Sequence, residues 1–222
     1  MVKKKKKRRL KVKRFLTLLI ILSLVFFALY LLLKVPIMNI VIKGNSVLSD
    51  QEIIHQANLD NYPSFILTLG IKVKSDVMKN KYVENVKVTK GLLKIKINVQ
   101  EKKILYIDKL TNKKITMDGI IDDDKMLCVP YFVNNLPKDK YSYFLKAMNK
   151  LDRDILCKMS EIKYDPNDID KDRYIAFMND GNYVYLTVNK FSKLNKYNTI
   201  LESVGKKSGT LYLDYGDYFQ AR

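Results

Sequence analysis

The sequence has few of the residues that build catalytic or metal centres. Its one histidine, His55, excludes any site that needs two imidazoles, including His-rich zinc centres, and a Ser-His-Asp triad would depend on this single base. Its two cysteines, Cys128 and Cys157, cannot form a four-thiolate metal site and allow at most one disulfide. The eight glycines include no GxGxxG or P-loop run. We therefore expect no catalytic residue, no cofactor and no metal, and we place His55 on the surface.

The positive charge is concentrated at the N-terminus. The 222 residues carry 41 Lys and Arg against 23 Asp and Glu, a net charge of +18, and residues 1–14 hold ten basic side chains and no acid. Residues 15–33 carry no charge and as a helix would span about 28 Å, close to the roughly 30 Å hydrocarbon core of a bilayer. The run lacks the polar face of a soluble helix and the small-x-small site of a cleaved signal peptide. We predict an uncleaved membrane anchor.

The basic residues before the anchor predict its orientation. The positive-inside rule places residues 1–14 in the cytoplasm and residues 34–222 outside it, a single-pass type II topology. We interpret the basic tail as topogenic charge that also attracts anionic lipid, because no aromatic side chain before Phe15 offers a stacking platform for nucleic acid. Outside the cytoplasm a disulfide between Cys128 and Cys157 is an alternative, but two buried thiols are the default expectation.

The region after the anchor has the pattern of a small α+β domain. Residues 37–43 favour a strand, and Ser49 with Glu52 has the capping-box spacing that begins a helix. A second short helix is predicted to begin at Ser75. Residues 83–90 favour a strand, Gly91 a reversal, and residues 93–99 alternate apolar with polar side chains as a half-buried strand does. The predicted order is strand, helix, helix, strand, strand.

The rest of the chain predicts a second α+β module, joined to the first near residues 102–105. Its strongest signal is a hairpin in which Asp180-Gly181 separates residues 174–179 from 183–188. Apolar side chains at helical spacing predict one amphipathic helix over 141–155 and another over 191–204. The three adjacent carboxylates at 122–124 are interpreted as a solvated loop, since calcium loops space their ligands at alternate positions. Further strands are predicted at 104–108, 113–117, 128–133, 210–214 and 217–221.

Five segments in this order resemble the FtsQ/DivIB family of cell-division proteins. I-V-I-K-G-N-S at 40–46 with L-S-D-Q-E-I-I at 48–54 resembles the start of the family's POTRA domain. E-K-K at 101–103 with L-Y-I at 105–107 is similar to the stretch that closes it. M-D-G-I-I at 117–121, D-G-N-Y-V-Y-L at 180–186 and L-Y-L-D-Y at 211–215 resemble three later family segments. The order of the five segments is more specific to the family than any single segment is.

The resemblance implies an α+β protein with one N-terminal transmembrane helix. A POTRA domain of β-α-α-β-β order would be followed by a second α+β module with a mostly antiparallel sheet. The expected divisions are a basic cytoplasmic tail (1–14), the transmembrane helix (15–33), the POTRA domain (35–104) and a C-terminal β domain (105–222). The implied function is a non-catalytic divisome scaffold in the cell membrane at the division septum, with FtsL-type and FtsB/DivIC-type partners and no nucleic acid or small-molecule substrate. A POTRA-containing secretion or chaperone component, a cell-wall enzyme and a cell-wall-binding membrane protein remain alternatives.

The C-terminal segment is the candidate partner-binding site. Exposed edge strands are normally protected by Lys or Pro, but residues 210–222 contain neither and are rich in aromatic side chains, which are typical of interface cores. We predict β-augmentation, in which a partner segment pairs with this edge through backbone hydrogen bonds. Burial of the same side chains in the module's own core is the competing interpretation; in the family the last strands carry the FtsB/DivIC contact. The candidate residues are Leu211, Tyr212, Tyr215, Tyr218 and Phe219.

Overall fold

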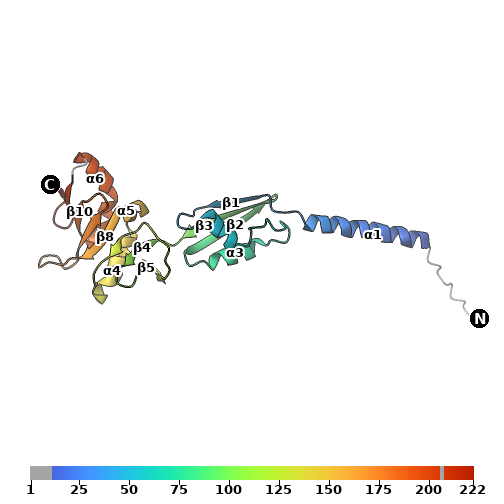
Figure 1. The fold of residues 1–222 in the computed structure, drawn as a ribbon, viewed down its shortest axis with the longest axis horizontal. Helices are drawn as coiled ribbons and strands as arrows, with labels where there is room; N and C mark the ends of the chain where they lie inside the picture. The colour runs from blue at the N-terminus through green and yellow to red at the C-terminus, as the bar shows by residue number, and fades with distance from the viewer. Residues whose placement is uncertain (1–11, 206–207) are drawn as a thin grey trace, which may run out of the picture. The chain divides into compact units, whose positions relative to one another are not determined.

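The computed structural model describes residues 12–205 and 208–222, and it begins with an apolar helix (Figure 1). This helix, α1 (Val12–Leu33), is apolar from Phe15 onward, and none of its residues is buried. Among the described residues it is the one helix long and apolar enough to cross a membrane. It begins before the predicted span of 15–33, because Lys13 and Arg14 continue the same helix. Residues 1–11 of the basic tail lie outside the described residues.

The chain divides into two compact units, residues 1–101 and 102–222. The first unit contains α1 and the predicted strand-helix-helix-strand-strand domain. Its three-stranded sheet has the order β1-β3-β2, with β1 parallel to β3 and β2 antiparallel to β3. The alternation over 93–99 is confirmed, because Ile95, Ile97 and Val99 are buried. The elements are β1 (Asn39–Lys43), α2 (Asp50–Gln56), α3 (Gly70–Met78), β2 (Val83–Gly91) and β3 (Lys94–Glu101).

Of the two helix starts predicted in the first unit, one is confirmed and the other is wrong. The capping box is confirmed, because the Ser49 side chain accepts from the Glu52 amide and the Glu52 carboxylate accepts from the Ser49 amide. The predicted start of α3 at Ser75 is wrong, since the helix already begins at Gly70. Tertiary contacts fix the earlier start: the preceding loop is hydrogen bonded at Phe65 N–H to Val35, and Val73 in the first turns is buried.

A single carboxylate closes the first unit. Glu101, the last residue of β3, is 4% exposed and accepts hydrogen bonds from the backbone N–H groups of Ser46, Val47 and Leu48 at 2.8–2.9 Å. Burial disfavours the charged form of Glu101, but these hydrogen bonds outweigh it and hold the pKa of the carboxyl below its usual value. The turn that presents the three amides needs Gly44, whose φ is +86° and whose Cβ position lies 2.3 Å from the Val99 carbonyl oxygen. The G-N-S motif at 44–46 and Glu101, which is distant in sequence, therefore stabilise the same turn.

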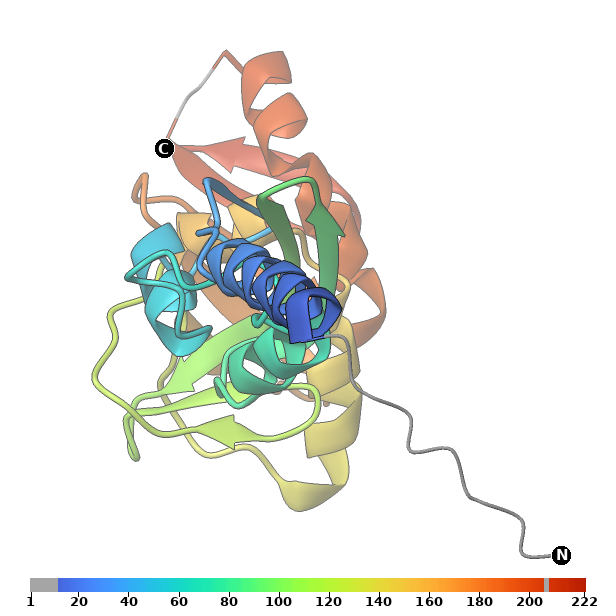
Figure 2. The same ribbon diagram turned by 90° about the vertical axis from the view of Figure 1, so that its right-hand side faces the viewer.

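The second unit is built on a nine-stranded mixed sheet with the order β12-β11-β10-β9-β8-β7-β4-β5-β6. Five neighbouring pairs are antiparallel, and three, β10-β11, β7-β8 and β4-β7, are parallel. The C-terminal strands (red) and β4–β6 (green) lie at opposite ends of this sheet (Figures 1 and 2). Its strands are β4 (Ile104–Asp108), β5 (Lys113–Thr116), β6 (Ile120–Ile121), β7 (Tyr131–Phe132), β8 (Met159–Tyr164), β9 (Arg173–Met178), β10 (Tyr183–Thr187), β11 (Gly209–Tyr212) and β12 (Tyr218–Ala221).

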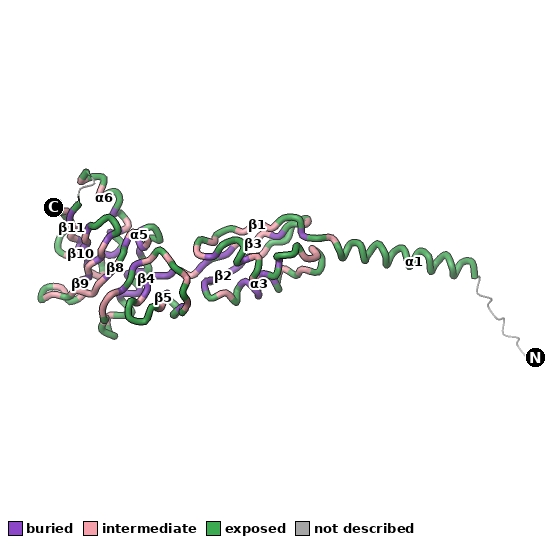
Figure 3. The backbone as a smooth tube through the Cα atoms, viewed as in Figure 1, coloured by how far each residue is buried: buried purple, intermediate pink, exposed green. Residues whose placement is uncertain are grey.

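An aromatic cluster forms the core of the second unit. Phe144 is completely buried on α4 (Lys138–Asn149), and its ring lies 4.9–5.5 Å from those of Tyr106, Phe132 and Tyr174. Phe191, on a 3-10 helix η1 (Val188–Lys196), meets the Phe144 ring edge-on at 6.0 Å. The same cluster therefore joins two helices to strands from across the sheet, and Figure 3 shows the burial along the backbone of this unit.

Both long amphipathic helices predicted in this unit are interrupted. The helix predicted over 141–155 is α4 followed by α5 (Arg153–Lys158), and the helix predicted over 191–204 is η1 followed by α6 (Tyr197–Ser203). At the first break Asp152 has extended φ and ψ angles, and its N–H donates to the Asn195 side chain. The Lys103 ammonium donates to the carbonyl oxygens of Asn149 and Leu151 there. Side chains distant in sequence thus satisfy the backbone groups that a continuous helix would have paired.

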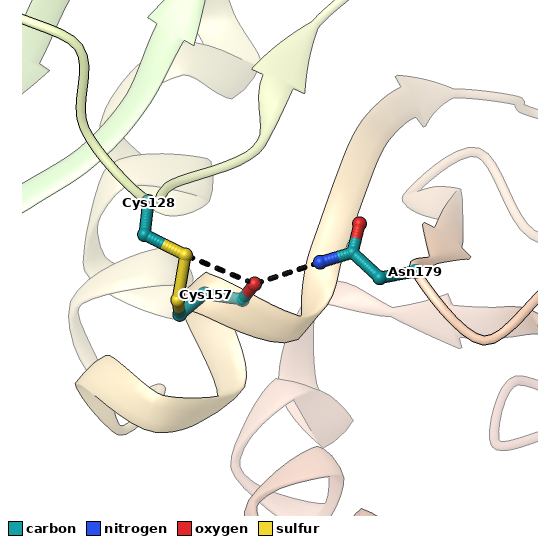
Figure 4. The surroundings of a disulfide bond; sticks show 3 residues. All are labelled: Cys128, Cys157 and Asn179. Atoms are coloured by element: carbon teal, nitrogen blue, oxygen red, sulfur yellow. Dashed lines mark hydrogen bonds between the residues drawn. A yellow bond between two sulfur atoms is a disulfide. The ribbon is translucent and has the colours of Figure 1, made fainter.

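The cysteines form a disulfide, so the default expectation of two buried thiols is wrong (Figure 4). Cys128 is exposed and lies in the loop before β7, whereas Cys157 lies in the last turn of α5. The Cys157 carbonyl oxygen also accepts a hydrogen bond from the Asn179 side chain at 2.8 Å. The bridge closes a separation of 29 residues and ties an otherwise irregular loop to the helix that leads into β8.

The polar residues singled out in the sequence have local partners. His55 is exposed, and its Nδ1 lies 3.0 Å from the Asp60 carboxylate. Asp123 lies 2.6 Å from the ammonium of Lys114, whose side chain is only 3% exposed. The acidic loop at 122–124 therefore contributes one carboxylate to a largely buried ion pair, where the sequence indicated only a solvated loop.

Candidate partner-binding edge

β12 is an edge strand of the nine-stranded sheet. It pairs antiparallel with β11 in the register Tyr212↔Tyr218, Leu211↔Phe219 and Thr210↔Gln220, and no described strand pairs with its other side. β11 in turn lies parallel to β10, so the chain crosses over through η1 and α6 before it adds the last two strands. The predicted strands at 210–214 and 217–221 are confirmed, with slightly different ends.

The ladder pattern shows which backbone groups of β12 face outward. The Arg222 N–H donates to the Ser208 carbonyl at 2.9 Å, so this pair lies at a hydrogen-bonded position. Hydrogen-bonded and non-hydrogen-bonded pairs alternate in antiparallel strands, so Tyr218 and Gln220 also direct their backbone groups at β11. The N–H and C=O groups of Phe219 and Ala221 therefore face away from β11, toward the open edge.

Stacked tyrosines run across the strands beside this edge. The Tyr185, Tyr212 and Tyr218 rings come from β10, β11 and β12, with centroids 5.3 and 4.7 Å apart and interplanar angles of 11° and 14°. The Arg173 guanidinium of β9 lies over the Tyr185 ring at 4.6 Å and continues the row. Tyr218 ends it at the edge and is 51% exposed. This row presents flat, amphipathic contact area of the kind found in interfaces.

The structure separates the five candidate residues into different environments. Tyr212 and Tyr218 belong to the exposed face, whereas Leu211 is 2% exposed and lies in the core. Phe219 lies opposite Leu211 and packs against the core from the edge strand. Tyr215 lies in the β11–β12 connection and is 73% exposed. Side-chain contact with a partner is therefore open to Tyr212, Tyr215 and Tyr218, while Leu211 is placed to support the strand from beneath.

A buried polar cluster positions β11, and sequence analysis did not find it. Asn182 is 3% exposed; its Oδ1 accepts from the Gly209 N–H at 2.7 Å, and its Nδ2 donates to the Tyr197 hydroxyl at 2.9 Å. That hydroxyl donates to the Asp180 carboxylate at 2.8 Å. Burial, together with Asp180, raises the pKa of Tyr197. The D-G-N turn was recognised as a hairpin signal, but its contact with a strand 27 residues later has no local signature.

Gly209 allows β12 to approach β11 closely. A Cβ atom at this position would lie 2.1 Å from the Gln220 carbonyl oxygen and 2.7 Å from the Phe219 ring. The far end of the β11–β12 connection is held by Asp217, whose carboxylate pairs with Lys193 and lies 3.6 Å from the Lys190 ammonium on η1. Lys193 lowers the pKa of Asp217 most. Both ends of the short β11–β12 hairpin are thus fixed to the rest of the unit.

The fold and edge define a class of protein: an α+β chain with an apolar N-terminal helix, a POTRA-like domain and a second module that ends in an open strand. The sequence profile named POTRA domain, FtsQ-type, matches residues 35–102. The chain is 27% identical to cell division protein DivIB of Listeria monocytogenes, over 98% of this chain and 85% of that protein. It is 28% identical to DivIB of Bacillus subtilis, over 97% of this chain and 87% of that protein.

A solved structure is also similar, that of the major extracytoplasmic domain of DivIB from Geobacillus stearothermophilus. It is 25% identical, with a TM-score of 0.39, and covers 48% of this chain and 97% of that one. Residues 35–102 therefore match a POTRA domain of the FtsQ type, and the chain is similar to DivIB cell-division proteins over nearly its full length.

Proposed function

We propose that this protein is a non-catalytic scaffold of the cell-division machinery, anchored by α1, with residues 34–222 outside the cytoplasm at the septum. Its partners are FtsL-type and FtsB/DivIC-type division proteins. The nearly full-length similarity to DivIB proteins supports a division role and favours it over the secretion, chaperone and cell-wall alternatives. The observation that carries the mechanism is the open edge of β12, flanked by an exposed tyrosine.

Binding would proceed by addition of a partner strand to β12. The outward N–H and C=O groups of Phe219 and Ala221 would pair with the partner backbone, which gives affinity independent of partner side chains. Tyr218 and Tyr212 would then pack against partner side chains on one face, extending the stacked row. The edge is pre-formed, because Asn182 and Asp217 fix both ends of the β11–β12 hairpin, so little conformational entropy is lost on binding.

The experiment measures binding of the full chain, reconstituted in lipid nanodiscs, to a FtsB/DivIC-type partner of the same species. Tyr218→Lys places a charge on the exposed face at the start of the edge strand, and we expect about a tenfold loss of affinity, which corresponds to roughly 1.4 kcal/mol. Tyr143→Lys is the matched control, because Tyr143 is also an exposed tyrosine, 63% accessible, but lies on α4. Unchanged affinity of Tyr218→Lys, with an unchanged melting temperature, would contradict the mechanism.

A second substitution tests the backbone pairing itself. Ala221→Pro removes one N–H that faces outward and leaves the hydrogen bonds between β11 and β12 in place. We expect weaker partner binding at nearly unchanged stability, whereas Ala221→Ser, which keeps the N–H, should bind normally. Equal affinities of the two variants would show that the partner does not pair with this strand.

A further inference from the structure

Large apolar side chains are exposed at one end of the POTRA domain. They lie on the loop that leads into α3, on the first turn of α3, on the β2–β3 turn and just before β1. Isolated exposed apolar residues are ordinary, but several on adjoining segments mark an interaction surface. The residues are Met38, Ile66, Leu67, Leu69, Ile71 and Leu92, which are 71%, 45%, 66%, 63%, 86% and 93% exposed. We call them the apolar end of the POTRA domain.

Printed contacts join the segments of this apolar end. The Lys90 ammonium, next to the β2–β3 turn, donates to the carbonyl oxygens of Phe65 and Thr68 at 2.6 and 2.7 Å. The Leu93 carbonyl accepts from the Met38 N–H at 2.8 Å. The loop into α3, the β2–β3 turn and the start of β1 are therefore held side by side, and their exposed residues form one surface.

The covalent connection keeps this surface near the end of α1. The Val35 carbonyl, two residues beyond the last residue of α1, already accepts from the Phe65 N–H at 2.9 Å. The Ile37 N–H donates to the Pro63 carbonyl at 3.0 Å. Two residues span at most about 7 Å, so Val35, which is hydrogen bonded to the loop that carries Ile66 and Leu67, lies within that reach of the end of the helix. When α1 spans a bilayer, that end lies at the boundary between hydrocarbon and headgroups.

The charges around the apolar end are of one sign. Residues 34–43, 62–75 and 87–96 contain eight lysines and no Asp or Glu. Among them Lys72 and Lys94 are exposed and flank Ile71 and the β2–β3 turn. A lysine near an anionic membrane surface is attracted to it, and amphipathic surfaces of this kind sit roughly 5–10 Å deep at the headgroup boundary. An apolar surface ringed by lysine matches the chemistry of a lipid leaflet that contains anionic headgroups.

We propose that the apolar end of the POTRA domain inserts into the leaflet at the C-terminal end of α1, with the surrounding lysines at the lipid phosphates. The inference rests on the proposed anchoring by α1 and extends it, because the membrane would hold the domain itself as well as the helix. Insertion would fix which face of the domain points away from the bilayer, toward partners.

The absence of tryptophan from the sequence provides a direct test. Leu67→Trp and Leu92→Trp each introduce a single tryptophan, which can be excited selectively over the tyrosines. The full chain is reconstituted into vesicles of phosphatidylglycerol and phosphatidylcholine with brominated acyl chains. Phe26→Trp, within α1, reports whether the anchor is inserted. Met126→Trp, at a position 95% exposed in the second unit, is the water-exposed control. We expect blue-shifted emission and bromine quenching at 67 and 92 that is several-fold greater than at 126.

The outcomes distinguish insertion of the apolar end from anchoring of the chain by α1. Quenching at 26 with solvent-like emission at 67 and 92 would overturn the inference alone, and no quenching at 26 would overturn both. A blue shift at 67 that grows with protein concentration but is not quenched by bromine would identify a second copy as the occupant. Replacing Lys72 and Lys94 by Glu in the Leu67→Trp chain should reduce quenching in vesicles with phosphatidylglycerol, and not in vesicles of phosphatidylcholine alone. If the two replacements reduced quenching in neither lipid, or equally in both, the proposed role of the lysines would be contradicted.

Discussion

The two units of this protein are closed by different chemistry. In the first unit one carboxylate, that of Glu101, accepts three backbone hydrogen bonds from the turn before α2. In the second unit a covalent bond between Cys128 and Cys157 ties a loop to α5, and a neutral amide, Asn182, holds β11. Acid therefore destabilises the first unit by protonating Glu101, and reducing agents destabilise the second unit by breaking its disulfide. Domains in one chain can be destabilised independently for this reason.

Removing the disulfide gives the largest expected change. Closing a loop of about 30 residues is worth roughly 3–4 kcal/mol in the chain-entropy account, so Cys128→Ser should lower the stability of the second unit by about that amount. Thermal unfolding with and without dithiothreitol measures it: the wild type with reductant should match Cys128→Ser without it. The first unit should be unaffected, and a shift of its transition would contradict the independence of the two units.

Glu101→Ala should destabilise the first unit by about 2–3 kcal/mol, because it leaves several backbone N–H groups without their charged acceptor. Hydrogen exchange of the Ser46–Leu48 amides is the local measurement, and these amides should lose protection. Glu84→Ala is the matched control, since that exposed glutamate on β2 accepts from the Gln100 side chain and, among the described residues, from no backbone N–H. Equal effects of the two substitutions would show that the buried carboxylate has no special role.

The same carboxylate predicts how acid affects the first unit. The pKa of Glu101 is lower in the folded state than its usual value of 4.5, so its contribution is complete above that value. The contribution is lost as the pH falls through the lower, folded-state pKa. The urea concentration needed to unfold the first unit should therefore fall as the pH decreases below about 4.5. Glu101→Gln should show a shallower dependence in that window, and an identical slope would contradict the assignment.

Asn182→Ala should have the smallest effect on stability, about 1–2 kcal/mol, but a larger effect on partner binding. It leaves the Gly209 N–H without its acceptor and releases the start of β11. Asn195→Ala is the matched control, because the Asn195 amide likewise accepts one hydrogen bond and donates another, but to the backbone of Asp152 and Lys150 near the break between α4 and α5. Asn182→Ala should lose partner affinity and Asn195→Ala should keep it, which binding at equal folded concentration would measure.

Local patterns predicted most of the first unit. The capping box and the period-two alternation of β3 are each encoded within a few residues, and the order of the predicted elements resembles a known domain. The early start of α3 escaped this reasoning, because it depends on a loop fixed by contacts with Val35 and Ile37. Sequence patterns therefore work where the physical cause is local.

The second unit was less predictable because its decisive contacts are long-range. The β9–β10 hairpin was found from its Asp180-Gly181 turn, but nothing local reveals that β7 lies between β4 and β8. The break between α4 and α5 is stabilised by hydrogen bonds to the side chains of Lys103 and Asn195, which lie far away in sequence. The candidate edge was predicted as a segment rich in aromatic residues, but only the register separates exposed Tyr218 from buried Leu211.

The crossover between β10 and β11 has a consequence for when the edge comes into being. Among the described residues β11 and β12 follow every other strand in the sequence, and β11 pairs with β10 across the intervening η1 and α6. In the proposed topology residues 34–222 cross the membrane in chain order, so the segments of this hairpin arrive outside the cytoplasm after β4–β10. On the proposed mechanism, a partner strand would bind molecules in which β12 is already paired with β11, and would not bind unfolded ones. Assembly with the partner would therefore depend on completed folding of the second unit.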